Sequence, residues 1–206
     1  ARTFDPVRSP ELALLPEGFS GVARFTSDAP IAVQALWDVS DSKAAVSAFE
    51  GVAIEAAAPV LYAPMIHAAM PWPSEGATVA SRETVIAVMN PEDAPVDVTV
   101  TYRGHGGTCA GHTYATSPVS IPAGAGVVFD QSGSEPPTGK SPLPGGCAAS
   151  AVISASGGRI AAVAIDLVSD ASGIVTQAAA YNAQAVGAAA RHVISPIYRK
   201  RQTTAS

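Results

Sequence analysis

Charged residues are scarce in this 206-residue sequence, at 14% of the chain against a usual share of roughly 25%. Lys and Arg together number 12 and Asp and Glu 17, which gives a net charge of −5. A protein that binds nucleic acid needs a clustered basic surface, so this balance excludes that class of partner. No apolar run approaches the ~20 residues of a membrane-spanning helix. We therefore expect neither nucleic-acid binding nor a membrane span.

Glycine and proline are abundant, with 18 and 17 residues, and 48% of the sequence is hydrophobic. Few charges and many turn-forming residues favour short strands joined by tight turns. In Val96–Tyr102 apolar and polar residues alternate strictly, which predicts a strand with one buried face. Similar runs are Val60–His67, Thr84–Met89, Val119–Phe129, Ala149–Ser154, Ile160–Val168 and Ile174–Tyr181. This pattern predicts an all-β fold, an antiparallel immunoglobulin-like β-sandwich.

The sequence contains a long internal repeat. Pro30–Val33 resembles Arg159–Ala162, and Phe49–Gly51 resembles Tyr181–Ala183. Matches in the same order, at nearly the same spacing, are Leu15–Pro16 with Leu143–Pro144 and Ala63–Ile66 with Ser195–Tyr198. A unit of this length suits a sandwich domain better than one turn of a solenoid.

The phase of the repeat predicts three segments. Residues 1–58 correspond to the second half of a unit, residues 59–191 to one complete β-sandwich unit, and residues 192–206 to the first strand of a following unit. We interpret the chain either as a subunit whose ends are completed by neighbours or as a window cut from a longer tandem array.

The segment from Ser42 to Ala58 fits two interpretations. It is rich in Ala, and Val46, Phe49 and Val52 have nearly helical spacing, so propensity favours a helix over 43–57. The equivalent run in the repeat, which begins at Ile174, is β-branched, and equivalent positions of a repeat share one backbone conformation. We therefore expect a strand, with the helix as the alternative.

Four strand and turn landmarks carry a family resemblance. They are Leu61–Ile66, Ala87–Pro91, Ile121–Ala125 and Pro30–Val33. Together they resemble repeat modules of large exported surface proteins of filamentous and thermophilic bacteria. The resemblance implies tandem β-sandwiches at the cell surface, and it implies no catalytic residues.

The two cysteines, Cys109 and Cys147, both lie in Gly-rich, turn-like surroundings. A disulfide between them is the expected state, and it would suit a secreted protein. The alternative is a pair of unrelated free thiols. His105 and His112 flank Cys109 at a spacing that could hold zinc, but a fourth ligand is missing nearby and a disulfide would remove the thiolate.

Two pairs of aspartates, Asp38 with Asp41 and Asp166 with Asp170, fall at equivalent ends of predicted strands. Clustered carboxylates can bind calcium. Asp is also a common turn residue, because its side chain accepts hydrogen bonds from nearby backbone amides. We favour turn chemistry over metal binding, and we expect no cofactor.

No pattern of catalytic residues emerges from the sequence, so we expect a protein that is not an enzyme. The leading hypothesis is a structural subunit of an extracellular fibre or surface layer, a homopolymer that assembles head to tail by β-strand donation. The donor strand would comprise Val193, Ile194, Pro196, Ile197 and Tyr198. The alternative is an adhesive or carbohydrate-binding segment of a longer tandem-domain surface protein, with surface glycans as partners.

Overall fold

The computed structural model describes residues 23–38, 46–72, 80–131, 141–185 and 187. Within these ranges the chain is all-β, apart from residues in a 3-10 conformation. The elements are β1 (Gln34–Asp38), β2 (Val46–Glu50), η2 (Ile54–Ala56), β3 (Val60–Ala68), β4 (Met70–Trp72), β5 (Ala80–Met89), β6 (Val96–Gly107), β7 (Thr113–Ala115), β8 (Val119–Ile121), β9 (Gly126–Asp130), β10 (Cys147–Ser156), β11 (Ala161–Ser169), β12 (Val175–Asn182) and β13 (Gln184–Ala185).

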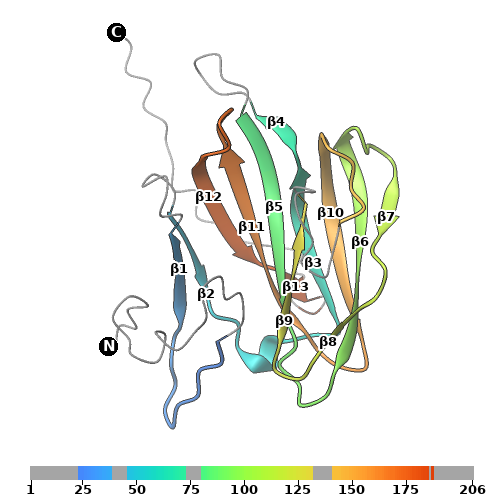
Figure 1. Cartoon of the computed structure of the whole chain (residues 1–206). Helices are drawn as coiled ribbons and strands as arrows, with labels where there is room; N and C mark the ends of the chain where they lie inside the picture. The colour runs from blue at the N-terminus through green and yellow to red at the C-terminus, as the bar shows by residue number, and fades with distance from the viewer. Residues whose placement is uncertain (1–22, 39–45, 73–79, 132–140, 186, 188–206) are drawn as a thin grey trace.

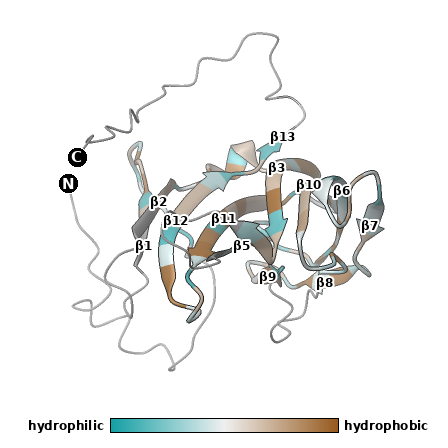
Figure 2. Cartoon of the chain, turned by 90° about the horizontal axis from the view of Figure 1, so that it is seen from above, coloured by the Kyte–Doolittle hydropathy of each residue, from teal (hydrophilic) through white to brown (hydrophobic). Residues whose placement is uncertain are grey.

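The strands form two main antiparallel sheets and a separate hairpin (Figure 1). The first sheet, here called the β10 sheet, has the order β13-β3-β10-β6-β7, with β8 also paired to β6. The second, the β5 sheet, has the order β12-β11-β5-β4, with β9 also paired to β5. Strands β1 and β2 pair with each other, and β2 lies beside β12 at one end of the β5 sheet (Figure 2).

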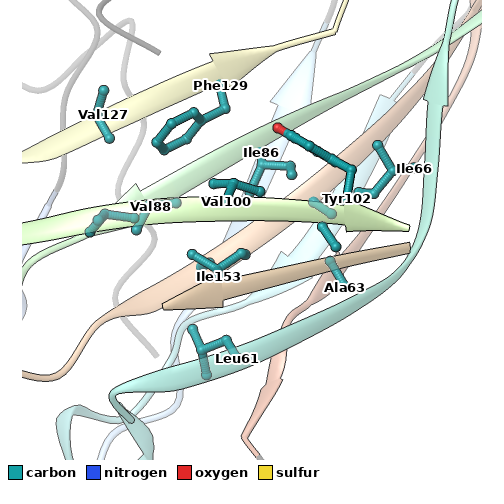
Figure 3. Close-up of a cluster of buried hydrophobic side chains, with 14 of the residues drawn as sticks. Leu61, Ala63, Ile66, Ile86, Val88, Val100, Tyr102, Val127, Phe129 and Ile153 are labelled. Carbon is teal, nitrogen blue, oxygen red and sulfur yellow. The ribbon is translucent and has the colours of Figure 1, made fainter. Parts of the chain in front are cut away.

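The core lies between the two sheets, because alternate residues of each strand point inward. Val96, Val98, Val100 and Tyr102 of β6 are almost completely buried, as the strict alternation of this run predicts. They pack with inward residues of the β5 sheet such as Phe129 (Figure 3). Burial of these large apolar side chains supplies most of the free energy that favours folding.

The sequence predicts one strand over Val119–Phe129, and this prediction is wrong. The run divides into β8 and β9, which belong to different sheets. Between them the chain turns at Gly124, where φ is +66°, a value that favours glycine. The buried side chain of Asn90 holds this turn, since its Nδ2 donates to the carbonyl oxygens of Ile121 and Pro122, each at 3.0 Å.

The chain also changes sheets between β3 and β4. Ala69 separates the two strands and has a φ of +44°, the only positive φ outside glycine in the described residues. Strand β3 pairs with β10, whereas β4 pairs with β5. The left-handed backbone conformation of Ala69 changes the direction of the chain, so that one extended segment contributes strands to both sheets.

For the segment 42–58, the expected strand is confirmed over Val46–Glu50, and residues 42–45 lie outside the described residues. The extension of that strand to residue 58 is wrong, because Ile54–Ala56 form a 3-10 turn. Pairing with β1 decides the conformation of β2 against the helical propensity of its alanine-rich sequence.

Strand pairing agrees with the sequence repeat in two hairpins. The matches of Pro30–Val33 with Arg159–Ala162 and of Phe49–Gly51 with Tyr181–Ala183 align Gln34 with Val163 and Glu50 with Asn182. Gln34 lies opposite Glu50 and Val163 lies opposite Asn182, and this agreement continues along the whole of β1–β2. The hydrogen bonds at the open ends of the hairpins, Gly51 N to Val33 O and Ala183 N to Ala162 O, have the same alignment.

Candidate functional site

Cys109 and Cys147 form a disulfide, as the sequence predicts. Their Cα atoms lie 5.2 Å apart, and both side chains are completely buried. Cys147 begins β10, and Cys109 lies in the turn that follows β6. The bond therefore ties this turn to the neighbouring strand and closes a long loop of the chain.

The glycines around the disulfide are required by close backbone contacts. A Cβ atom on Gly104 would overlap the carbonyl oxygen of Cys109 and lie 2.8 Å from its Sγ. Gly107 has a φ of +67°, and a Cβ there would overlap the carbonyl oxygen of Gly146. The Gly-rich surroundings seen in the sequence thus allow β6 to approach the start of β10 closely.

The histidines that flank Cys109 in the sequence are both exposed. The ring of His112 lies beside Tyr114, with 6.4 Å between the ring centroids. Cys109 forms the disulfide, so it has no thiolate to join His105 and His112 as a zinc ligand. Across the described ranges, no group of three or more His, Cys, Asp or Glu side chains is arranged to hold a metal ion.

Of the four aspartates singled out in the sequence, the structure describes the side chains of Asp166 and Asp170. Asp170 is partly exposed and accepts hydrogen bonds from the backbone N–H groups of Ser172 and Ile174, so it stabilises a turn. Hydrogen bonds from these two residues, the Ser172 hydroxyl first, lower the pKa of Asp170. In the sequence alignment of the two hairpins, Asp38 falls at the position of Leu167, next to Asp166. Asp41 lies outside the described residues.

Asp166 is buried at the centre of a polar cluster between the sheets. Its Oδ2 accepts a 2.6 Å hydrogen bond from Nε of Arg82. Its Oδ1 accepts one from the hydroxyl of Thr84 at 3.0 Å and lies 3.0 Å from Nδ1 of His67. Burial by itself raises the pKa of Asp166, but the hydrogen bonds and charges of His67 and Arg82 outweigh it, and the pKa lies below its ordinary value.

The cluster joins the two sheets, because His67 belongs to β3 whereas Arg82, Thr84 and Asp166 belong to the β5 sheet. The hydroxyl of Thr84 also accepts a 2.9 Å bond from the backbone N–H of His67. The cluster has a carboxylate and an imidazole but its members bond to one another, so its arrangement serves as a buried anchor for β3.

Tyr181 of β12 extends this anchor to the outer edge of β3. Its hydroxyl donates to the carbonyl oxygen of Met65 at 2.6 Å and accepts from the backbone N–H of Met65 at 3.1 Å. Burial raises the pKa of Tyr181 to about 12, although the bond to Met65 and the charge of Arg82 act against the rise. The tyrosine thereby occupies backbone groups that an edge strand would otherwise offer to another chain.

The sequence did not reveal this cluster, since His67, Arg82 and Asp166 are far apart along the chain. A weak signal is present: Thr84 and Asp166 are polar, yet they lie in phase with the inward apolar residues Ile86 and Ala164. Polar residues at inward positions need buried partners, which points to a network without naming its members.

The segment before the N-terminal hairpin exposes an apolar residue at a position that is buried before the hairpin with which its sequence aligns. Ile160 precedes β11 and is 0% exposed, while the corresponding residue Ile31 precedes β1 and is 52% exposed. Ile160 exchanges backbone hydrogen bonds with Ala58, which precedes β3. The predicted donor strand, Val193–Tyr198, lies outside the described residues.

No protein-family model matches this chain, and no curated protein matches its sequence. The chain is similar to a solved structure described as "Crystal Structure of Thermotoga maritima 1070", with 12% sequence identity and a TM-score of 0.44. That similarity covers 62% of this chain and 93% of the other. In the described part of the chain, every helical segment is too short to cross a membrane.

Proposed function

We propose that this chain is a secreted, non-catalytic structural subunit of an extracellular fibre or surface layer, in which copies join head to tail by β-strand donation. The observation that carries the proposal is the contrast between Ile31 and Ile160, which occupy corresponding positions and are 52% and 0% exposed. An exposed apolar residue beside the two-stranded β1–β2 sheet is a place where another strand can bind.

The shared register of the two hairpins supports a structural repeat. The segments that follow the two hairpins support the same alignment. Glu55 follows β2, and the aligned residue Gly187 follows β12 and β13; both have 3-10 conformation. By this correspondence the N-terminal hairpin is the second half of a sandwich unit. We propose the immunoglobulin-like class for the complete unit, and the resemblance to modules of exported surface proteins agrees with it.

The acceptor for the donated strand would be the residues beside Ile31, just before β1. In the β5 sheet β11 pairs with both β12 and β5, while the described partner of β1 is β2. This difference supports the β1 side of the hairpin as the place where a strand from another copy would pair.

The donor would be Val193–Tyr198, which corresponds to Leu61–Ile66 of β3. In β3, Leu61 is buried and Tyr62 is 43% exposed. The corresponding donor residues are Val193, expected to point into the acceptor, and Ile194, expected to point outward. Contacts of this head-to-tail kind form filaments when their rotation does not close a ring.

The disulfide supports a location outside the cytoplasm, because such bonds persist in oxidising compartments and are rare in the cytosol. The buried polar cluster also agrees with a structural role. It holds β3 to the β5 sheet, and both oxygens of the Asp166 carboxylate already have hydrogen-bond partners.

The test compares two matched variants, Val193→Asp and Ile194→Asp, by light scattering and electron microscopy of the purified chain. Val193→Asp should abolish filaments, because it places a charge in the acceptor, and Ile194→Asp should keep them. Discrete monomers of the unmodified chain, or filaments from Val193→Asp, would refute strand donation.

A second test uses the bridge between Ala58 and Ile160 as a template. The corresponding pair is Ala190 and Ile31, so cysteines introduced at both positions should cross-link one copy to the next and give a ladder of oligomers under oxidising conditions. A cross-linked monomer would mean that the tail closes on its own chain, which contradicts head-to-tail assembly.

A groove between β2 and β12 favours the second candidate, an adhesive or carbohydrate-binding segment of a longer surface protein. It has a volume of about 350 Å³ and is lined by amide, carboxylate and aromatic side chains, among them Gln34, Glu50, Asn182 and Tyr181. Planar polar groups and an aromatic ring suit the hydroxyls and flat faces of a sugar. Binding to a glycan array that Gln184→Ala removes and Gln177→Ala retains would support this candidate.

A further inference from the structure

The β5 sheet has apolar side chains on both of its faces. Its inward residues, such as Ile86, Val88 and Ala164, belong to the core. Its outward residues are also largely apolar and include Val85, Ala87, Val128, Val163, Ile165 and Leu167. We call these six residues the outer face. An antiparallel sheet that faces water normally alternates apolar residues inward with polar residues outward, so this sheet has the pattern of one that is covered on both sides.

Strand register makes the outer face continuous. Ile165 of β11 lies opposite Val85 of β5, and Val163 lies opposite Ala87. Ala87 in turn lies opposite Val128 of β9, so the apolar residues extend across three neighbouring strands. Directly opposed residues on one face of a sheet have touching side chains.

Acidic residues lie at the border of the outer face. Asp130 lies opposite Val85, and Glu83 lies opposite Leu167. Burial and the nearby charge of Asp130 raise the pKa of Glu83, while a bond from Ser81 acts the other way. An apolar centre with a polar border is the composition of a protein–protein interface.

The β10 sheet provides an internal comparison. The outward residues of its central strands are mostly polar and include Asp97, Thr99, Thr101, Ser150 and Ser154. The same chain therefore gives one outer face the composition of a solvated sheet and the other the composition of a buried one. Scarcity of charge in the sequence as a whole does not explain this difference between the faces.

The described structure also indicates what covers the outer face. At the end of the β5 sheet, Asn182 donates to the carbonyl oxygen of Glu50 at 3.1 Å, and Ala48 and Ala180 line the same groove. In the two hairpins Glu50 corresponds to Asn182 and Ala48 to Ala180, and Asn182 and Ala180 are outward residues. Two aligned positions thus already meet within one chain, through the Asn182 side chain and the Glu50 backbone, and the outer face continues from this contact along β11 and β5.

We propose that the outer face is a self-association surface, which packs against the same face of a second copy of this chain. The pairing is isologous, because both copies use one patch, and the two sheets would stack face to face at roughly 10 Å. This contact differs from strand donation and does not depend on it. Together the two contacts would convert single filaments into paired ones.

The test uses the full chain with Val193→Asp, which disables strand donation, and measures its mass by sedimentation velocity over a range of concentrations. This chain should form dimers. Adding Ile165→Lys, which places a charge at the centre of the outer face, should make it monomeric. Adding Thr101→Lys, at a similar central position on the polar face of the β10 sheet, should leave the dimer intact.

Ile165→Lys is informative only if the variant folds, which near-ultraviolet circular dichroism checks. The nearly isosteric pair of changes Val85→Thr with Val163→Thr provides a milder test and should weaken dimerisation at least about tenfold, because four buried methyl groups are lost per dimer.

A monomeric Val193→Asp chain, or a dimer that survives both Ile165→Lys and the double threonine change, would overturn the proposal. Loss of filaments with Val193→Asp but not with Ile165→Lys would separate donation from face pairing.

Discussion

His67 and Asp166 are joined across the two sheets, with 3.0 Å between Nδ1 of the imidazole and Oδ1 of the carboxylate. His67 is 6% exposed and Asp166 is 5% exposed. The same carboxylate binds Arg82 at 2.6 Å, so a single aspartate connects a strand of the β10 sheet to the centre of the β5 sheet. The stability of this two-sheet fold should therefore depend on the charge of Asp166.

Asp166→Ala should destabilise the protein by about 3–5 kcal/mol, because it removes the acceptor from buried polar groups. The ion pair of Arg159 with Glu92 is the matched control, since it is close in length at 2.7 Å but lies at the surface. Glu92→Ala should have little effect. Urea unfolding of the two variants measures the difference, and equal losses would contradict the anchoring role of Asp166.

Acid should weaken the fold through the same carboxylate. The pKa of Asp166 is lowered in the folded state, so its contribution is present above the ordinary aspartate pKa and is lost as pH falls through the folded value. We expect the urea midpoint to fall below pH ~4 in the unmodified chain and to fall less in Asp166→Asn. A midpoint with the same pH dependence in both proteins would exclude Asp166 as the cause.

Alkali should act through two tyrosines, the buried Tyr102 and the half-buried Tyr181. Burial raises the pKa of Tyr102 and of Tyr181 to about 12, from 10.0. A raised pKa means that the stability they contribute is complete below pH ~10 and is lost as pH rises towards 12. Ultraviolet titration of tyrosinate should show a late transition that coincides with unfolding, and Tyr181→Phe should remove one group from it. Early titration of every tyrosine would contradict their burial.

Breaking the disulfide should cost roughly 3–4 kcal/mol, because Cys109 and Cys147 have a sequence separation of 38 and the bond restricts the unfolded chain. Thermal unfolding with and without a reductant measures this loss. The double variant Cys109→Ala with Cys147→Ala should unfold at a lower temperature and respond no further to reductant. A reductant effect in that variant would mean that another process is being measured.

Close packing beside the disulfide predicts a difference between two neighbouring glycines. Gly104→Ala should be strongly destabilising, since the new methyl group would overlap the carbonyl oxygen of Cys109. Gly106→Ala should be tolerated, because its methyl group would meet the Cβ of Ala148 at 3.5 Å, an ordinary contact. Thermal unfolding midpoints of the two variants test this, and similar midpoints would show that the turn can shift away.

Much of the strand pattern could be predicted from local sequence. The alternation in Val96–Tyr102 agrees with the burial in β6, and turn residues bound most of the other predicted strands correctly. The error at Val119–Phe129 arose because β8 and β9 are both apolar and are separated only by the short turn Pro122–Ala125. Periodicity detects extended conformation, but it does not show that a chain has passed from one sheet to another.

The disulfide was predictable because only two cysteines exist, which leaves one way to pair them. The polar cluster was not predictable in the same way. His67, Arg82 and Asp166 come from three strands, and their meeting depends on the order of those strands in the sheets. Similarly, the apolar outer face appears only when the register aligns Val85 with Ile165.

The sequence by itself determined the all-β class, the inward residues of the clearest strands and the identity of the disulfide, because each of these depends on residue type and spacing along one chain. Only the tertiary structure decided which strands are neighbours, where the charge of Asp166 is compensated, and which sheet carries apolar residues on both faces. The physical reason is that hydrogen bonds and burial between strands depend on distances across the fold, and residues far apart in the sequence do not encode those distances in any local pattern.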